Sequence, residues 1–118
     1  IIPDGDLSPR QQTSLKLARA VAEQSASIHA AIIPPASDRV RTAGLYGRTT
    51  QEIFISADML ESGRQTVDTM IHELAHHSSG AEDLEEKHAA AMTMLAGRVV
   101  EKTAGGSFDK YLAEPFRW

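Results

Sequence analysis

The segment "RQTVDTMIHELAHHSSG", residues 64–80, predicts the helix around which the rest of the fold is arranged. Its apolar residues recur at the i, i+3, i+4, i+7, i+8 spacing that gives a helix one buried face. They are Val67, Met70, Ile71, Leu74 and Ala75. Because glycine readily adopts the left-handed conformation that closes a helix, Gly80 is the natural cap. We therefore expect a helix over residues 64–78.

The flanking sequence predicts helices and one pair of strands. Ser8 and Pro9 have the residue types of a helix N-cap and first turn, and the apolar spacing after them predicts a helix over residues 9–29. Residues 39–56 are rich in β-type residues and predict two short strands, the second ending near Ser56, followed by one helical turn. A last helix is expected over residues 83–103. Helix, hairpin, helix and helix together indicate an α+β domain.

Length and composition narrow the classes of function. A chain of 118 residues with 42% hydrophobic and 24% charged residues is sufficient for one domain with a single core. The net charge of −4 and the lack of a basic stripe argue against nucleic acid, and no apolar run is long enough to predict a membrane span. The chain has no cysteine, so any metal must be held by imidazole and carboxylate groups. We expect an excised part of a longer, cytoplasmic protein.

The string "HELAH", residues 72–76, places two metal-binding side chains on one side of the predicted helix. His72 and His76 are four residues apart, so their imidazoles leave the helix about one turn from each other. On a helical wheel both point roughly 130–170° away from the centre of the apolar face. Glu73 is placed to reach a water beside the metal. This is the HExxH pattern of zinc peptidases; the alternative is an exposed polar helix face that carries two histidines by chance.

A catalytic zinc site requires a third protein ligand, which must come from the chain beyond Gly80. The candidates are Glu82, Asp83, Glu85, Glu86 and His88. His88 shares the inward face of the last predicted helix, although a histidine at the edge of the core with one hydrogen bond would give the same pattern. Asp83 is close enough in sequence to reach the ion, although its spacing from Glu86 also fits a helix-capping box.

The remaining polar residues have weaker assignments. Glu82, Glu85 and Glu86 fit a solvated acidic helix start, with ligation by Glu85 or Glu86 as an alternative. Asp68 could orient His72, although an acid in the first helical turn needs no further role. Tyr46 or Tyr111 could donate a hydrogen bond to a reaction intermediate, although each also fits a packing residue. His77 fits a surface group or a side chain that supports a metal ligand. His29 lies far from the other histidines in the sequence, and nothing in the pattern around it indicates a function.

Residues 40–100 resemble the zincin metallopeptidases in their minimal form, through a strand pair, the "HELAH" helix and a following helix. The string "IHELAHHSSGAED" also resembles metallopeptidase-like domains that lie behind an ATPase module of the Hsp90 or histidine-kinase kind. In that group an aspartate follows the serine–glycine turn, which favours Asp83 as the third ligand. An aromatic residue usually stands where this chain has His88, and that departure keeps His88 as the alternative. A metzincin is disfavoured, because its glycine would stand where this chain has Ser79.

The resemblance implies a metalloendopeptidase in which His72, His76 and Asp83 bind zinc and Glu73 is the general base. It also implies a peptide or protein substrate that pairs with the edge strand before the active helix, and an ATPase module in the same full-length chain. Two alternatives stay open. One is a catalytically silent zincin-fold module that binds or regulates within a larger ATPase-containing protein, and the other is a metal hydrolase that cleaves a different bond.

Overall fold

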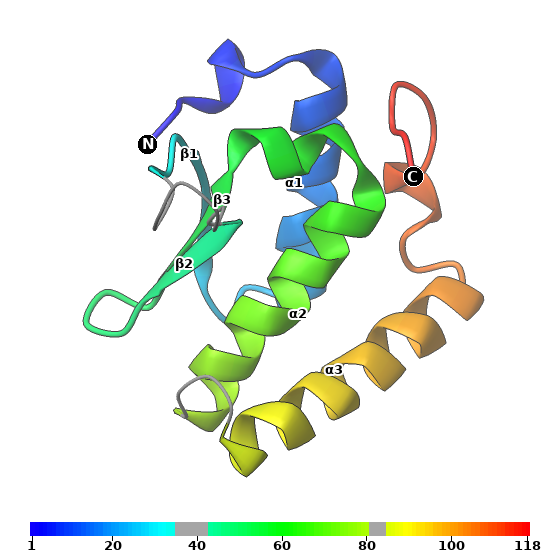
Figure 1. The fold of residues 1–118 in the computed structure, drawn as a ribbon. Helices are drawn as coiled ribbons and strands as arrows, with labels where there is room; N and C mark the ends of the chain where they lie inside the picture. The colour runs from blue at the N-terminus through cyan, green and yellow to red at the C-terminus, as the bar shows by residue number, and fades with distance from the viewer. Residues whose placement is uncertain (35–42, 81–84) are drawn as a thin grey trace.

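Three α-helices and a three-stranded sheet make up the fold in a computed structural model of the chain, which describes residues 1–34, 43–80 and 85–118 (Figure 1). The elements are α1 (Pro9–Ala22), β1 (Ser27–Ala31), β2 (Gly44–Gly47), β3 (Glu52–Ser56), α2 (Gly63–Ser79) and α3 (Glu86–Ala104). Short 3-10 turns lie at Asp4–Asp6, Ala57–Glu61 and Asp109–Tyr111. The predicted α+β class is confirmed.

Helix α1 begins as predicted but ends earlier. The hydroxyl of Ser8 accepts from the backbone N–H of Gln11 at 3.1 Å, and the Gln11 side chain accepts from the N–H of Ser8 at 2.9 Å. The helix ends at Ala22, because Glu23 takes a left-handed conformation with φ 53°. The expected helix over residues 9–29 was therefore wrong beyond residue 22, where strand β1 was missed.

The sheet has the order β1-β3-β2, with β1 parallel and β2 antiparallel to β3. The antiparallel pair confirms the predicted strands where they can be compared, whereas residues 39–42 lie outside the described part of the chain. One face of the sheet belongs to the core shared with α1 and α2. Its core residues are Ile28, Ala30, Ile53 and Ile55.

The N-terminal segment covers the outer edge of β1. The N–H of Ile2 donates to the carbonyl of Ala30 at 2.8 Å, and Arg19 donates to the carbonyl of Ile28 at 3.0 Å. Arg19 also bonds Asp4 at 2.6 Å, and this hydrogen bond lowers the pKa of the Asp4 carboxyl. Both backbone carbonyls that β1 directs away from β3 are thus satisfied.

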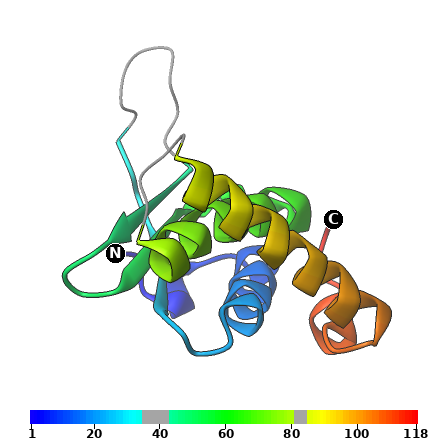
Figure 2. The same cartoon turned by 90° about the horizontal axis from the view of Figure 1, so that it is seen from below.

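Helix α2 packs against α1 on one side and α3 on another (Figures 1 and 2). Ser62 caps its start by accepting from the N–H of Gln65 at 3.1 Å, and Gly80, with φ 68°, ends it as predicted. Helix α3 begins at Glu86, with Glu85 as N-cap, rather than at residue 83. Glu86 is therefore the first residue of the helix, whereas Asp83, the other residue of the possible capping box, lies outside the described residues. In a run of acidic residues, several neighbouring positions are similarly favourable starts for a helix, because each places an acidic side chain near the positive end of the helix dipole.

Strand β2 passes very close to α2 at Gly44. A β-carbon at this position would lie 2.7 Å from Cγ2 of Thr69 and 3.1 Å from the carbonyl oxygen of Phe54. Only glycine lets the strand backbone approach the helix at this distance. The contact matters for the site, because Glu73 follows one turn after Thr69 on the same side of α2.

We predict that Gly44→Ala destabilises the domain by about 1–3 kcal/mol, because the added methyl group overpacks the contact between β2 and α2. Gly97→Ala is the matched control: an added β-carbon there meets nothing within 4 Å, so it should stabilise α3 by about 0.5–1 kcal/mol. Urea unfolding at low protein concentration measures both. Equal stability of the two variants would contradict the close contact at Gly44.

Candidate metal centre

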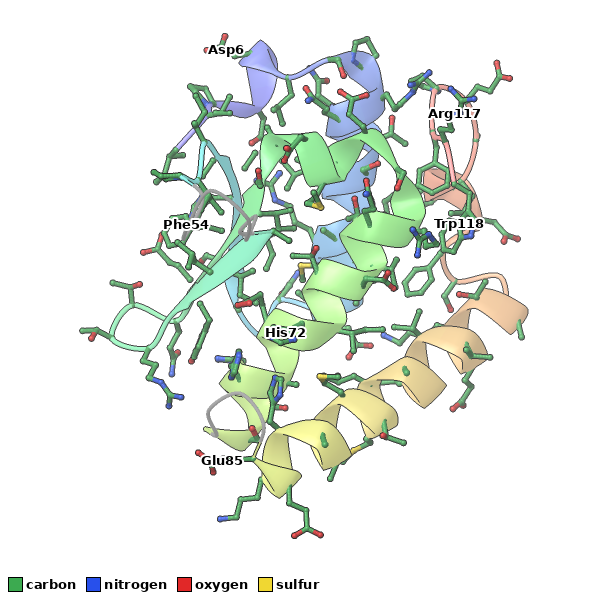
Figure 3. The ribbon with its side chains drawn as sticks, viewed as in Figure 1. Asp6, Phe54, His72, Glu85, Arg117 and Trp118 are labelled. Atoms are coloured by element: carbon green, nitrogen blue, oxygen red, sulfur yellow. The ribbon has the colours of Figure 1, made fainter. Side chains whose placement is uncertain are left out.

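His72 and His76 lie on one side of α2, next to the start of α3, where Figure 3 labels His72 and Glu85. Their ring centroids are 5.0 Å apart. Both histidines are only partly buried, whereas Met70, Leu74 and Ala75 on the core face of the same helix are almost inaccessible. The predicted division of α2 into a core face and a histidine face is confirmed.

His88 is the third histidine of the cluster and comes from α3. It is 4% exposed, and its ring centroid lies 4.8 Å from that of His72 and 4.0 Å from that of His76. One potential ligand atom from each of the three residues lies within 4.8 Å of the other two. Two adjacent helices therefore bring three imidazoles to one point, an arrangement that can hold a metal ion.

A hydrogen bond fixes the orientation of His88. Its Nε2 lies 3.0 Å from the backbone carbonyl oxygen of His72. Because a carbonyl oxygen only accepts, Nε2 must carry the proton, and a neutral ring then keeps its lone pair on Nδ1. Metal-binding histidines are commonly oriented in this way, with one ring nitrogen bonded to a backbone carbonyl.

The donor set fits a transition-metal ion. Nitrogen ligands at about 2.0–2.1 Å from zinc lie about 3.4 Å from one another in a tetrahedral site, so only a small closure of the three rings is needed. Imidazole also suits copper, iron and nickel. The arrangement thus establishes a candidate metal centre of three histidines rather than a particular metal.

Glu73 lies beside the cluster and is buried at 6% exposure. One of its carboxylate oxygens is 4.0 Å from Nε2 of His72, and Glu73 is not among the three grouped ligands. A β-carbon on Gly44 would lie 3.2 Å from Cγ of Glu73, so this side chain lies between α2 and strand β2. Sequence reasoning did not single out Gly44, although a glycine in a strand often marks a close backbone approach.

The other predicted ligands separate into two groups. Asp83, which the resemblance favours as the third ligand, lies outside the described residues, as does Glu82. Glu85 and Glu86 are exposed at the start of α3, as expected for a solvated acidic helix start. Among the described residues, His88 is therefore the third ligand candidate that joins the two histidines of α2.

Strand β2 and the turn after it contact the end of α2 through two side chains. The Tyr46 hydroxyl lies 3.0 Å from Nδ1 of His77, and Arg48 donates to the carbonyl of Gly80 at 2.9 Å. Tyr46 thus contacts His77, which is not one of the three clustered histidines. Asp68 forms an exposed ion pair with Arg64 at 3.6 Å.

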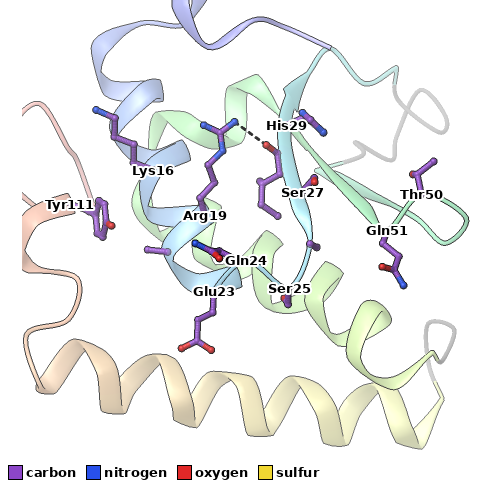
Figure 4. Close-up of a pocket in the computed structure, with 13 residues that line it drawn as sticks. Lys16, Arg19, Glu23, Gln24, Ser25, Ser27, His29, Thr50, Gln51 and Tyr111 are labelled. Atoms are coloured by element: carbon purple, nitrogen blue, oxygen red, sulfur yellow. Dashed lines mark hydrogen bonds between the residues drawn. The ribbon is translucent and has the colours of Figure 1, made fainter.

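A separate hollow of about 960 Å³ lies between α1, β1 and the turn before β3 (Figure 4). Lys16, Arg19, His29 and Tyr111 contribute to its lining, whereas none of the three clustered histidines does. His29 pairs with Glu52 at 2.7 Å and stacks on Phe54. The geometry of the three histidines therefore defines the candidate centre, and this hollow is a separate feature. Tyr111, one of the two candidate hydrogen-bond donors, lines the hollow and not the centre.

Comparisons with protein-family models, curated proteins and solved structures find no match to this chain. No helix in the described ranges combines the length and apolar character needed to cross a membrane. The arrangement of residues within the fold is therefore what supports a function.

Proposed function

We propose that this domain is a zinc-dependent peptidase in which His72, His76 and His88 bind the metal and Glu73 is the general base. The observation that carries the proposal is the convergence of three imidazoles, with a buried carboxylate beside them and an edge strand next to that carboxylate. Three histidines leave the fourth position of a tetrahedral zinc ion for water or substrate, as catalysis requires.

Each element has a role in the proposed reaction. Zinc, when bound, polarises the scissile carbonyl and acidifies the attacking water. The carboxylate of Glu73 takes a proton from that water and delivers it to the leaving amine. The hydrogen bond from His88 to the His72 carbonyl holds the third imidazole in its ligand orientation.

The outer edge of β2, which no strand in the described part of the chain pairs with, is the proposed binding site for an extended peptide. The carbonyls of Ala43 and Gly47 accept from the N–H groups of Ser56 and Gln51 on the β3 side. The alternating residues Gly44 and Tyr46 therefore direct their backbone groups to the outer edge. A substrate strand bonded there lies next to Glu73.

We predict that the chain binds about one equivalent of zinc and that His88→Ala weakens this binding by at least about 100-fold, because one of three ligands is lost. Asp83→Asn is the matched control and should leave the affinity within about twofold, because it keeps all three imidazoles. Calorimetric titration of zinc into metal-free protein measures both. Loss of affinity in Asp83→Asn and not in His88→Ala would instead assign the third ligand to Asp83.

We predict that Glu73→Gln lowers peptide cleavage by about 10²–10⁴-fold, because an amide cannot accept the proton, while zinc remains bound. Cleavage of a peptide library by the full-length chain, with metal content measured on the same samples, tests this. Asp68→Asn, an exposed carboxylate on the same helix, is the control that should stay active. Tight zinc binding without cleavage by the unsubstituted chain would contradict the peptidase and indicate the silent binding module.

A further inference from the structure

Helix α3 has an outer face made of exposed residues. Five exposed residues, Lys87, Ala90, Met94, Gly97 and Glu101, follow one another at spacings of three and four and form what we term the outer stripe. Met94, at its centre, is 72% exposed, and Gly97 has open space where a β-carbon would lie. The inner face carries His88 and Ala91 toward α2. Figures 1 and 2 both show α3 at the outside of the fold.

The charges of the outer stripe are placed symmetrically. Between Lys87 and Arg98 the helix carries no acidic or basic residue other than His88 on its inner face. Lys87 stands seven residues before Met94, and Glu101 stands seven residues after it. Neither of these two charges forms an ion pair within the described parts of the chain. An apolar centre thus has opposite unpaired charges at equal distances.

We propose that the outer stripe binds a second copy of this chain, with the two α3 helices antiparallel across a two-fold axis at Met94. In this arrangement Lys87 of each copy faces Glu101 of the other, so two ion pairs form by symmetry. A parallel arrangement would place Lys87 opposite Lys87 and Glu101 opposite Glu101, which costs energy. The small side chains of Ala90 and Gly97 let the helix backbones approach on either side of the paired methionines.

The size of the stripe limits the affinity. Fourteen residue steps at 1.5 Å make a contact about 21 Å long. A contact between two single helices of this length buries an area at the small end of specific protein interfaces. We therefore expect a concentration-dependent dimer. The stripe lies on the opposite side of α3 from His88, so association leaves the histidine cluster accessible and does not depend on the proposed peptidase activity.

Charge reversal tests the ion pairs. Lys87→Glu or Glu101→Lys should each raise the dimer Kd by about tenfold, because each change removes two ion pairs and adds two repulsive ones. The double variant Lys87→Glu with Glu101→Lys restores both pairs and should recover the original Kd. Both changes suit the helix dipole, with an acid in the first turn and a base near the last, so loss of helix does not explain weaker association.

Sedimentation velocity over a concentration series measures these constants, with circular dichroism confirming that each variant is folded. Lys16→Glu, an exposed charge change on α1, is the control that should leave the Kd unchanged. A monomer at all concentrations, or a double variant that associates no better than the single ones, would overturn the proposal.

Cross-linking tests the position of the two-fold axis. The chain has no cysteine, so Met94→Cys introduces one thiol per copy, and the axis places the two thiols together. Val100→Cys is the matched control, because Val100 is similarly exposed, at 66%, but lies on a different side of α3. Diamide should convert Met94→Cys to a covalent dimer and leave Val100→Cys monomeric. Equal cross-linking of the two variants would contradict the axis at Met94.

Discussion

The hydrogen bond from Nε2 of His88 to the backbone carbonyl of His72 is the interaction that joins the two helices of the candidate site. It fixes where the start of α3 crosses α2, and it fixes which ring nitrogen of His88 keeps a lone pair. One turn later Ala91 is also buried, and its small side chain permits the close helix packing that the bond requires. A longer residue at position 91 would separate the helices and remove His88 from the other two histidines. The geometry of the centre therefore depends on helix packing as much as on the ligands themselves.

Burial of polar groups distinguishes this region from the rest of the described chain. The buried polar residues are Ser14, Ser56, Thr66, Thr69, Glu73 and His88, of which only Glu73 and His88 are ionisable. Hydroxyl groups such as those of Thr66 and Thr69 donate to nearby backbone carbonyls and are inexpensive to bury. A buried carboxylate is costly unless something compensates it, and Nε2 of His72 lies 4.0 Å from one oxygen of Glu73. This position is compatible with the proposed role of Glu73 as general base.

Sequence reasoning identified α2, the glycine that ends it and the orientation of its histidines, because one helical period fixed both the apolar face and the histidine face. It did not identify Ser62 as the N-cap. It missed β1, because Ile28 stands seven residues after Val21 and this spacing fits a continued helix as well as a buried strand position. The left-handed conformation of Glu23, which ends α1, has no glycine to mark it. The grouping of His88 with His72 and His76 could not be derived either, since the sequence could not give the packing of α3 on α2. His88 was recognised only as one of five candidates, with Asp83 favoured over it by the resemblance.

Helix α3 is held to the domain by few fully buried side chains. In its nineteen residues only His88 and Ala91 are buried, while Leu95 and Val99 pack at the edge of the core. A helix with so little buried apolar surface gains much of its stability from other contacts. A metal ion bound through His88 would supply one of them, because any ligand that binds only the folded form stabilises it. Metal binding at the candidate centre would therefore stabilise the docking of α3 on α2, because His88 belongs to α3 and the other two histidines belong to α2.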